Sequence, residues 1–214
     1  MKNAKLGIRL PFYFGGFFIM TIGIALSVKS NLGVSPVSSI PYTMTCVWGI
    51  EMGRATIIFH AILVAIQIAL LRRKFEIKNL LQILVGVVFG SFTTLCNSLV
   101  ALAPTPENLL IRLLMCWAGT VFVAFGIFFY VPANIMPLAG EGTMLAISSL
   151  TGKPFPKVKI AFDISMVCVS LVTCLFFLHG LGSVGIGTVI AALLVGIELN
   201  MVTHRFGAWR DSLL

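Results

Sequence analysis

The chain has 214 residues, of which 58% are hydrophobic and only 10% are charged, and its mean hydropathy is +1.05. Soluble domains carry about 25% charged residues, so this composition excludes an ordinary soluble domain and predicts one polytopic membrane domain over residues 1–214. The net charge of +8 does not indicate nucleic-acid binding, because the basic residues flank apolar segments and form no patch with aromatic residues.

The apolar segments predict six transmembrane helices. The first, over residues 10–28, follows the basic stretch MKNAKLGIR and is too long for a signal-peptide core, so we interpret it as an uncleaved helix. The other five are expected at residues 55–71, 80–103, 109–131, 160–178 and 184–203.

Two segments between these helices are too broken to cross a bilayer. Residues 31–54 contain Pro36, Pro41 and several hydroxyl residues, and residues 134–159 contain Glu141 between two glycines. Irregular backbone survives at membrane depth only where protein buries it or where it lines a wet cavity. We therefore interpret both segments as re-entrant half-helices, whose N-terminal amides would carry a partial positive charge into that cavity.

The basic residues predict the orientation. With six crossings, twelve of the fifteen Lys and Arg residues fall on one side and only Lys29, Arg54 and Arg112 fall on the other. The positive-inside rule then places both termini in the cytoplasm.

The chain also repeats itself. A shift of 126 − 23 = 103 residues places Gly23 on Gly126, Gly16 on Gly119 and Arg9 on Arg112, which defines repeat units over about 9–103 and 109–204. Each unit has three crossings, so the two units must have opposite orientations in the membrane. The predicted fold is all-α, with six transmembrane helices, two re-entrant half-helices and a 3+3 inverted repeat.

The candidate binding residues cluster at the two half-helix starts and on the last helix. They are Asn31, Ser35, Ser38, Ser39, Gly140, Glu141, Gly142, Thr143 and Asn200. An ionisable group inside a bilayer costs about 3 kcal/mol and usually faces a cavity or a partner. Glu141 and Glu198 are therefore the candidate coupling carboxylates, expected to share one cavity.

Two further polar residues have no clear role, and no sequence motif indicates a metal site or an enzyme. Asp163 and His60 are either functional or interfacial. No CxxC pair, nucleotide-binding loop or hydrolase motif is present, so we expect no metal, no cofactor and no enzymatic activity.

Three stretches together carry a family resemblance: NLGVSPVSSIPYTMT, PLAGEGTMLAISSLTG and GIGTVIAALLVGIELN. They resemble the YczE/YyaS/YitT group of bacterial integral membrane proteins, and the third stretch is the most specific. The resemblance implies a similar helix count and a location in the bacterial plasma (inner) membrane. Transport is the role usually supposed for that group, and it implies no substrate.

The hypothesis favoured by these features is a secondary transporter or exporter of a small polar molecule, in which Glu141 and Glu198 couple transport to protons or to another cation. One alternative is a substrate-binding membrane subunit of a vitamin-type importer, although the AxxxA docking pattern of such subunits is not reproduced in the first helix. Another is a non-transporting regulator or scaffold. The expected partners are the lipid bilayer and a small molecule, and a homodimer is left open, as are the direction and the coupling ion.

Overall fold

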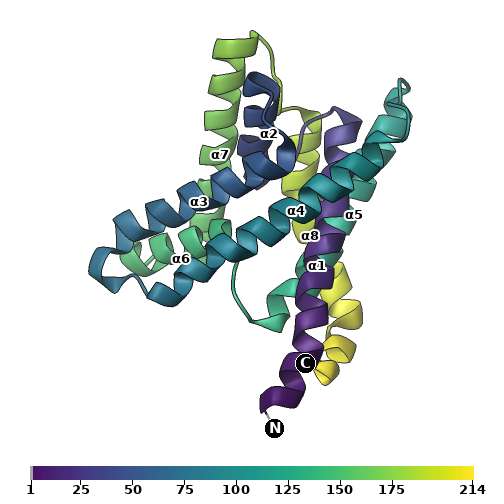
Figure 1. The fold of residues 1–214 in the computed structure, drawn as a ribbon. Coiled ribbons are helices and arrows are strands. Elements are labelled where there is room, and N and C mark those ends of the chain that lie inside the picture. Colours follow the sequence, from purple (N-terminus) through teal and green to yellow (C-terminus); the bar gives the residue numbers. More distant parts are fainter. Residues whose placement is uncertain (1) are drawn as a thin grey trace. The chain divides into compact units, whose positions relative to one another are not determined.

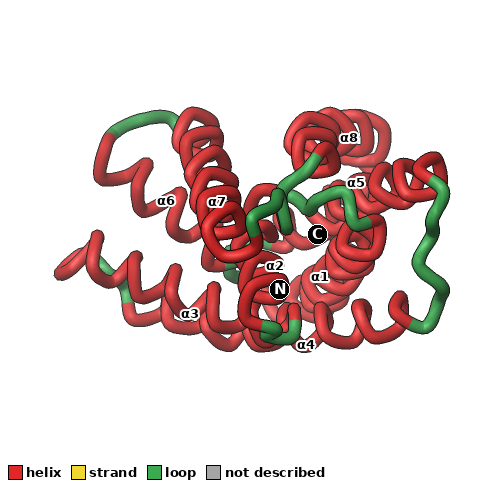
Figure 2. Tube along the Cα trace, turned by 90° about the horizontal axis from the view of Figure 1, so that it is seen from above, coloured by secondary structure: helices red, strands yellow, loops and turns green. Residues whose placement is uncertain are grey.

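The computed structural model describes residues 2–214, which form helices joined by short loops without any strand (Figures 1 and 2). Six helical stretches of this described chain are long and apolar enough to cross a membrane: Leu6–Ser30, Met52–Lys74, Ile77–Ala101, Leu109–Ala133, Phe155–Leu178 and Ile186–Leu213. They correspond to α1 (Lys2–Ser30), α3 (Met52–Leu71) with the short η1 (Arg72–Lys74), η2 (Ile77–Leu80) with α4 (Leu81–Ala101), α5 (Leu109–Ala133), α7 (Phe155–Leu178) and α8 (Ile186–Leu213). The prediction of an all-helical chain with six candidate spans is confirmed.

The two segments predicted as half-helices form short helices, α2 (Pro36–Trp48) and α6 (Ala139–Thr151). Each has 13 residues, a length of about 20 Å at 1.5 Å per residue, which is less than the roughly 30 Å of a bilayer core. Each helix ends at a glycine with φ of +67°, Gly49 or Gly152, a conformation that costs glycine no Cβ clash.

Helix ends repeat along the chain at the spacing found in the sequence. A shift of 103 residues carries the bounds of α2 onto those of α6, the end of α1 onto the end of α5, and the start of α3 onto the start of α7. Asn31 and Asn134, which terminate α1 and α5, have nearly equal left-handed φ angles of 50° and 48°. The same local signals therefore end helices at equivalent positions in both halves of the sequence.

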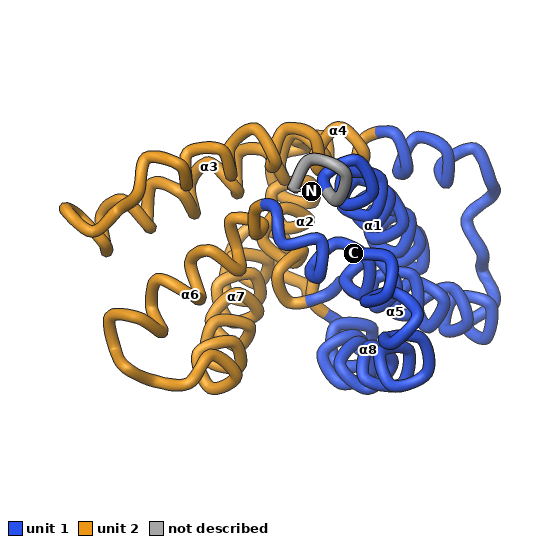
Figure 3. Tube along the Cα trace, turned by 90° about the horizontal axis from the view of Figure 1, so that it is seen from below, with its two compact units in different colours: residues 1–35, 95–135, 185–214 blue, residues 36–94, 136–184 orange. Residues whose placement is uncertain are grey.

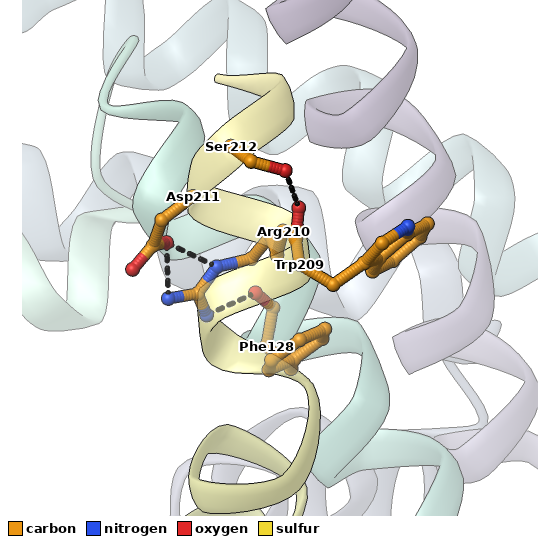
Figure 4. Close-up of polar contacts among 5 residues, drawn as sticks. All are labelled: Phe128, Trp209, Arg210, Asp211 and Ser212. Atoms are coloured by element: carbon orange, nitrogen blue, oxygen red, sulfur yellow. Dashed lines mark hydrogen bonds and ion pairs between the residues drawn. The ribbon is translucent and has the colours of Figure 1, made fainter.

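Three predicted boundaries differ from the structure by five residues or more. α1 begins at Lys2 instead of residue 10. α7 begins at Phe155 instead of residue 160, because Pro154 and Pro156 favour a helix start, where a missing N–H costs nothing. α8 continues ten residues beyond 203 to Leu213. The end of this helix is anchored by Arg210, which donates to the carbonyl of Phe128 at 3.1 Å and covers the ring of Phe128 (Figure 4).

The chain divides into two compact units (Figure 3). The first contains Met1–Ser35, Leu95–Ile135 and Gly185–Leu214, and the second contains Pro36–Thr94 and Met136–Val184. Each unit therefore takes helices from both halves of the sequence. The second unit has an apolar core of Phe59, Leu63, Val64, Ala139, Met144, Val158 and Phe162. That the whole chain forms one membrane domain stays a prediction.

In the first unit, α1 and α5 pack through two pairs of glycines. A Cβ atom on Gly16 would lie 2.8 Å from the carbonyl oxygen of Gly126, and one on Gly126 would lie 2.7 Å from that of Gly16. Gly23 and Gly119 contact each other in the same reciprocal way. The later glycine of α1 meets the earlier glycine of α5, so the two helices are antiparallel. Small residues at these positions let the two backbones touch.

Candidate binding site

The start of α6 is the polar centre of the second unit. Gln67 on α3 and Gln82 on α4 are both about 1% exposed, and the Gln67 Nε2 atom donates to Gln82 Oε1 at 2.9 Å. The same Nε2 donates to the carbonyl oxygen of Ala139 at 3.1 Å and to Thr143 Oγ1 at 3.3 Å. An uncharged amide cluster thus holds the first turn of α6 against α3 and α4.

Because Gly142 has no side chain, the amides of Gln67 and Gln82 can pack directly against its backbone. A Cβ atom at this position would lie 2.6 Å from Gln82 Oε1 and 3.0 Å from Gln67 Oε1, closer than real side chains approach. Gly140 differs, because its nearest neighbour would be Val37 Cγ1 at an ordinary 3.5 Å. Of the two glycines that flank Glu141, the second is the one required by packing.

Glu141 lies in the first turn of α6 and is half-buried. A carboxylate there is favourable, because the first turn of a helix carries unpaired amides and the positive end of the dipole. Thr143, the other predicted polar residue of this turn, is buried, and its hydroxyl donates to the carbonyl of Ala139 at 2.8 Å. Gly140–Thr143 therefore lie in the first turn of one helix, and their role in binding stays a prediction.

The predicted residues around α2 separate into two groups. Ser39 is fully buried, and its hydroxyl accepts from that of Ser170 on α7 at 2.8 Å. Ser35 and Ser38 are half-buried, and Asn31 is exposed in the turn after α1. Ser39 thus belongs to the α2–α7 contact, whereas Asn31 belongs to the first unit.

A second hydroxyl contact joins α2 to the loop that follows α7. Thr43 and Ser183 are buried with their hydroxyl oxygens 2.6 Å apart, and the thiol of Cys174 lies 3.7 Å from each. Neutral hydroxyl groups therefore hold α2 in place. At α6, the amides of Gln67 and Gln82 and the hydroxyl of Thr143 do the same.

The predicted residues on α8 lie in the first unit. Glu198 is half-buried, and its Oε1 accepts from the hydroxyl of Thr120 on α5 at 3.0 Å. Its buried Oε2 has no hydrogen-bond partner among the described residues. Asn200 is exposed. Glu198 and Glu141 belong to different units, so the cavity that they were expected to share stays a prediction.

The two ambiguous residues have different surroundings. His60 is buried, stacks on Phe89 with ring centroids 5.7 Å apart, and abuts Gly86, where a Cβ atom would lie 2.9 Å from the imidazole Nδ1. Asp163 pairs with Lys159 one turn earlier on α7 at 2.6 Å. His60 is therefore a packed core residue, and Asp163 belongs to a local ion pair. No group of His, Cys, Asp or Glu within residues 2–214 has a metal-binding arrangement.

Several polar residues of these sites were not singled out from the sequence. Gln67 and Gln82 could have been, since amides are rare inside apolar spans and usually find a partner there. Ser170, Ser183 and Thr120 carry no comparable signal, because single hydroxyl residues are common in transmembrane helices.

The chain is similar to known proteins over most of its length. The model of a "Family of unknown function (DUF6198)" matches residues 7–204. "Uncharacterized membrane protein YczE" of Bacillus subtilis (strain 168) is 28% identical over 201 residues, which are 92% of this chain and 86% of that protein. "Uncharacterized protein YyaS" of the same bacterium is 26% identical over 191 residues, 88% of this chain and 90% of that protein. No solved structure matches the chain.

Proposed function

The chain belongs to the DUF6198 family of YczE/YyaS-type membrane proteins, and from its own geometry we propose that it is a secondary transporter of a small polar molecule. It is a multi-pass membrane protein, with six helices of sufficient length and hydropathy. The proposal adds that its two halves have opposite orientations and that the half-helix starts bind the substrate.

The reciprocal contact of α1 with α5 is the observation that carries this proposal. Gly16 meets Gly126 while Gly23 meets Gly119, and the shift of 103 residues exchanges the two pairs. A contact that is unchanged when its partners are exchanged has twofold symmetry. Because α1 and α5 are antiparallel, this axis is perpendicular to both helices, so it lies in the membrane plane if they span. Inverted repeats of this kind are an architecture of secondary transporters.

The contacts in the second unit follow the same exchange. Ser39 on α2 meets Ser170 on α7, and their counterparts under the shift, Gly142 on α6 and Gln67 on α3, also meet. α2 and α6 therefore have equivalent neighbours despite different side chains. We propose that both are re-entrant and that their starts face a polar pathway, as broken helices do in transporters.

The α6 start is the better substrate site of the two. The buried amides of Gln67 and Gln82 hold this helix start in place, and the half-buried Glu141 adds one ionisable group beside it. A carboxylate at a helix start suits a small polar molecule that can donate hydrogen bonds. We propose Glu141 and Glu198 as the proton-carrying carboxylates, in a bacterial plasma membrane with both termini in the cytoplasm.

Flux into proteoliposomes tests this function. The purified protein is reconstituted, and uptake of a panel of small amines, amino acids, sugars and carboxylates is measured with and without a pH gradient. We expect gradient-driven uptake of one class, its loss in Glu141→Gln, and near-normal flux in Asp163→Asn, because Asp163 is held by Lys159. Uniform absence of flux from folded protein, or normal flux in Glu141→Gln, would contradict the proposal.

A further inference from the structure

The C-terminal end of α1 is closed by an arginine of α5. Arg112 donates from Nε to the carbonyl of Ser30 at 2.7 Å and from Nη2 to the carbonyl of Asn31 at 2.6 Å. The last carbonyls of a helix have no partner within the helix and carry the negative end of its dipole. A planar guanidinium satisfies two of them at once, so Arg112 caps α1.

The opposite end of the same helix pair is built to match. The shift of 103 residues carries Arg112 onto Arg9, and Ser30 and Asn31 onto Ala133 and Asn134. Facing positions of α1 and α5 have residue numbers that sum to 142, as for 16 and 126, 23 and 119, and 30 and 112. This register places Arg9 level with Ala133, at the end of α5.

No corresponding capping bond is formed at that end by the side chains that the structure describes. Within the part of the chain that the structure describes, Arg9 makes one side-chain hydrogen bond, from Nη2 to the backbone oxygen of Leu214 at 3.4 Å, and its buried Nε has no partner. Among the described residues, Asn134 makes a backbone bond to Val131 and accepts nothing from Arg9. A buried donor atom without a partner is costly, so the Nε of Arg9 lacks a carbonyl partner like the one that the Nε of Arg112 has in Ser30.

We infer that Arg112 and Arg9 are alternating caps, which close the ends of α1 and α5 in turn as the protein changes conformation. The inference rests on the proposed transport function, in which the two halves of the protein exchange conformations. In this structure the end of α1 is capped and the end of α5 is not. After the exchange, the end of α5 would be capped and the end of α1 would not. The present conformation is the one in which Arg112 is engaged. At the same end Lys29 donates to the carbonyl of Ala103 at 2.7 Å, a bond that its counterpart Pro132 cannot make.

Two matched distances test the alternation. Spin labels are placed at residues 8 and 131 near the α5 end, and at the equivalent residues 111 and 28 near the α1 end, in a background whose five cysteines are replaced by alanine. Pulsed electron paramagnetic resonance then gives both distance distributions in reconstituted protein. We expect Arg112→Gln to shorten the 8–131 distance and lengthen the 111–28 distance, and Arg9→Gln to leave a single population like that of the wild type.

Controls separate a switch from a static cap. Arg112→Lys keeps the charge but cannot donate to both carbonyls with a planar guanidinium. It should therefore shift both distances in the same direction as Arg112→Gln and by less. Arg205→Gln, at an exposed position of α8, should shift neither. Unchanged distributions in folded Arg112→Gln or Arg112→Lys protein would overturn the inference. The measurement needs no substrate, so a distance shift without flux would reject only the proposed transport, and flux without a shift would reject only the alternating caps.

Discussion

Gly142 is the residue on which the packing at the α6 start depends most directly. We expect Gly142→Ala to destabilise the protein by about 1–3 kcal/mol, because the new methyl group would overlap the amides of Gln82 and Gln67. Thermal unfolding in detergent measures the effect. Gly140→Ala is the matched control, since its methyl group would meet only Val37 at 3.5 Å and should leave the melting temperature unchanged or raised. Equal effects of the two substitutions would show that the amides do not pack against Gly142 as described.

Gln67 and Gln82 are predicted to depend on each other. Gln67→Leu leaves the buried Gln82 Oε1 without its donor, and an unsatisfied buried group costs about 1–3 kcal/mol. Replacing both glutamines by leucine removes donor and acceptor together, so the double variant should be less destabilised than the sum of the single ones. The double-mutant cycle is measured by thermal unfolding. Strict additivity would mean that the 2.9 Å bond contributes nothing.

At the scale of elements, the contact between α1 and α5 is predicted to need its glycines. A Cβ atom on Gly23 would lie 2.5 Å from the carbonyl oxygen of Gly119, so Gly23→Ala should force the helices apart and lower the melting temperature. Gly15 on the same helix has nothing within 4 Å of its Cβ position. Gly15→Ala should therefore be neutral or stabilising by up to about 1 kcal/mol, from helix propensity alone. The opposite ranking of the two variants would contradict the described register.

Most element boundaries could be predicted because the signals are local. Pro36, Gly49, Asn134 and Gly152 stop or start helices through their own backbone preferences, whatever surrounds them. The extension of α8 could not be predicted in this way. The charged and aromatic end of that helix is held by Arg210 and by its contact with Phe128, which lies on another helix.

The site was predictable in part for the same reason. Glu141 and its flanking glycines are conspicuous in an apolar chain, and the structure places them at a helix start. The partners of that turn, Gln67 and Gln82, come from residues far away in sequence. Their contact depends on how α3, α4 and α6 pack, which no local pattern specifies.

At the scale of the whole molecule, the proposed function requires the two halves to have opposite orientations in the membrane. The shift of 103 residues that aligns helix ends also exchanges the contacts between α1 and α5. Equivalent residues should consequently lie on opposite sides of the membrane. Trp48 and Thr151, the last residues of α2 and α6, are equivalent and both exposed.

Accessibility of single cysteines at these two positions tests that claim most directly. In a background without native cysteines, Trp48→Cys and Thr151→Cys are labelled in intact cells with a membrane-impermeant maleimide, and again after permeabilisation. Thr105→Cys and Ser212→Cys mark the outer and cytoplasmic sides. We expect residues 48 and 105 to be labelled from outside, and residues 151 and 212 to be labelled only after permeabilisation. Labelling of residues 48 and 151 from the same side would contradict the inverted arrangement of the two halves.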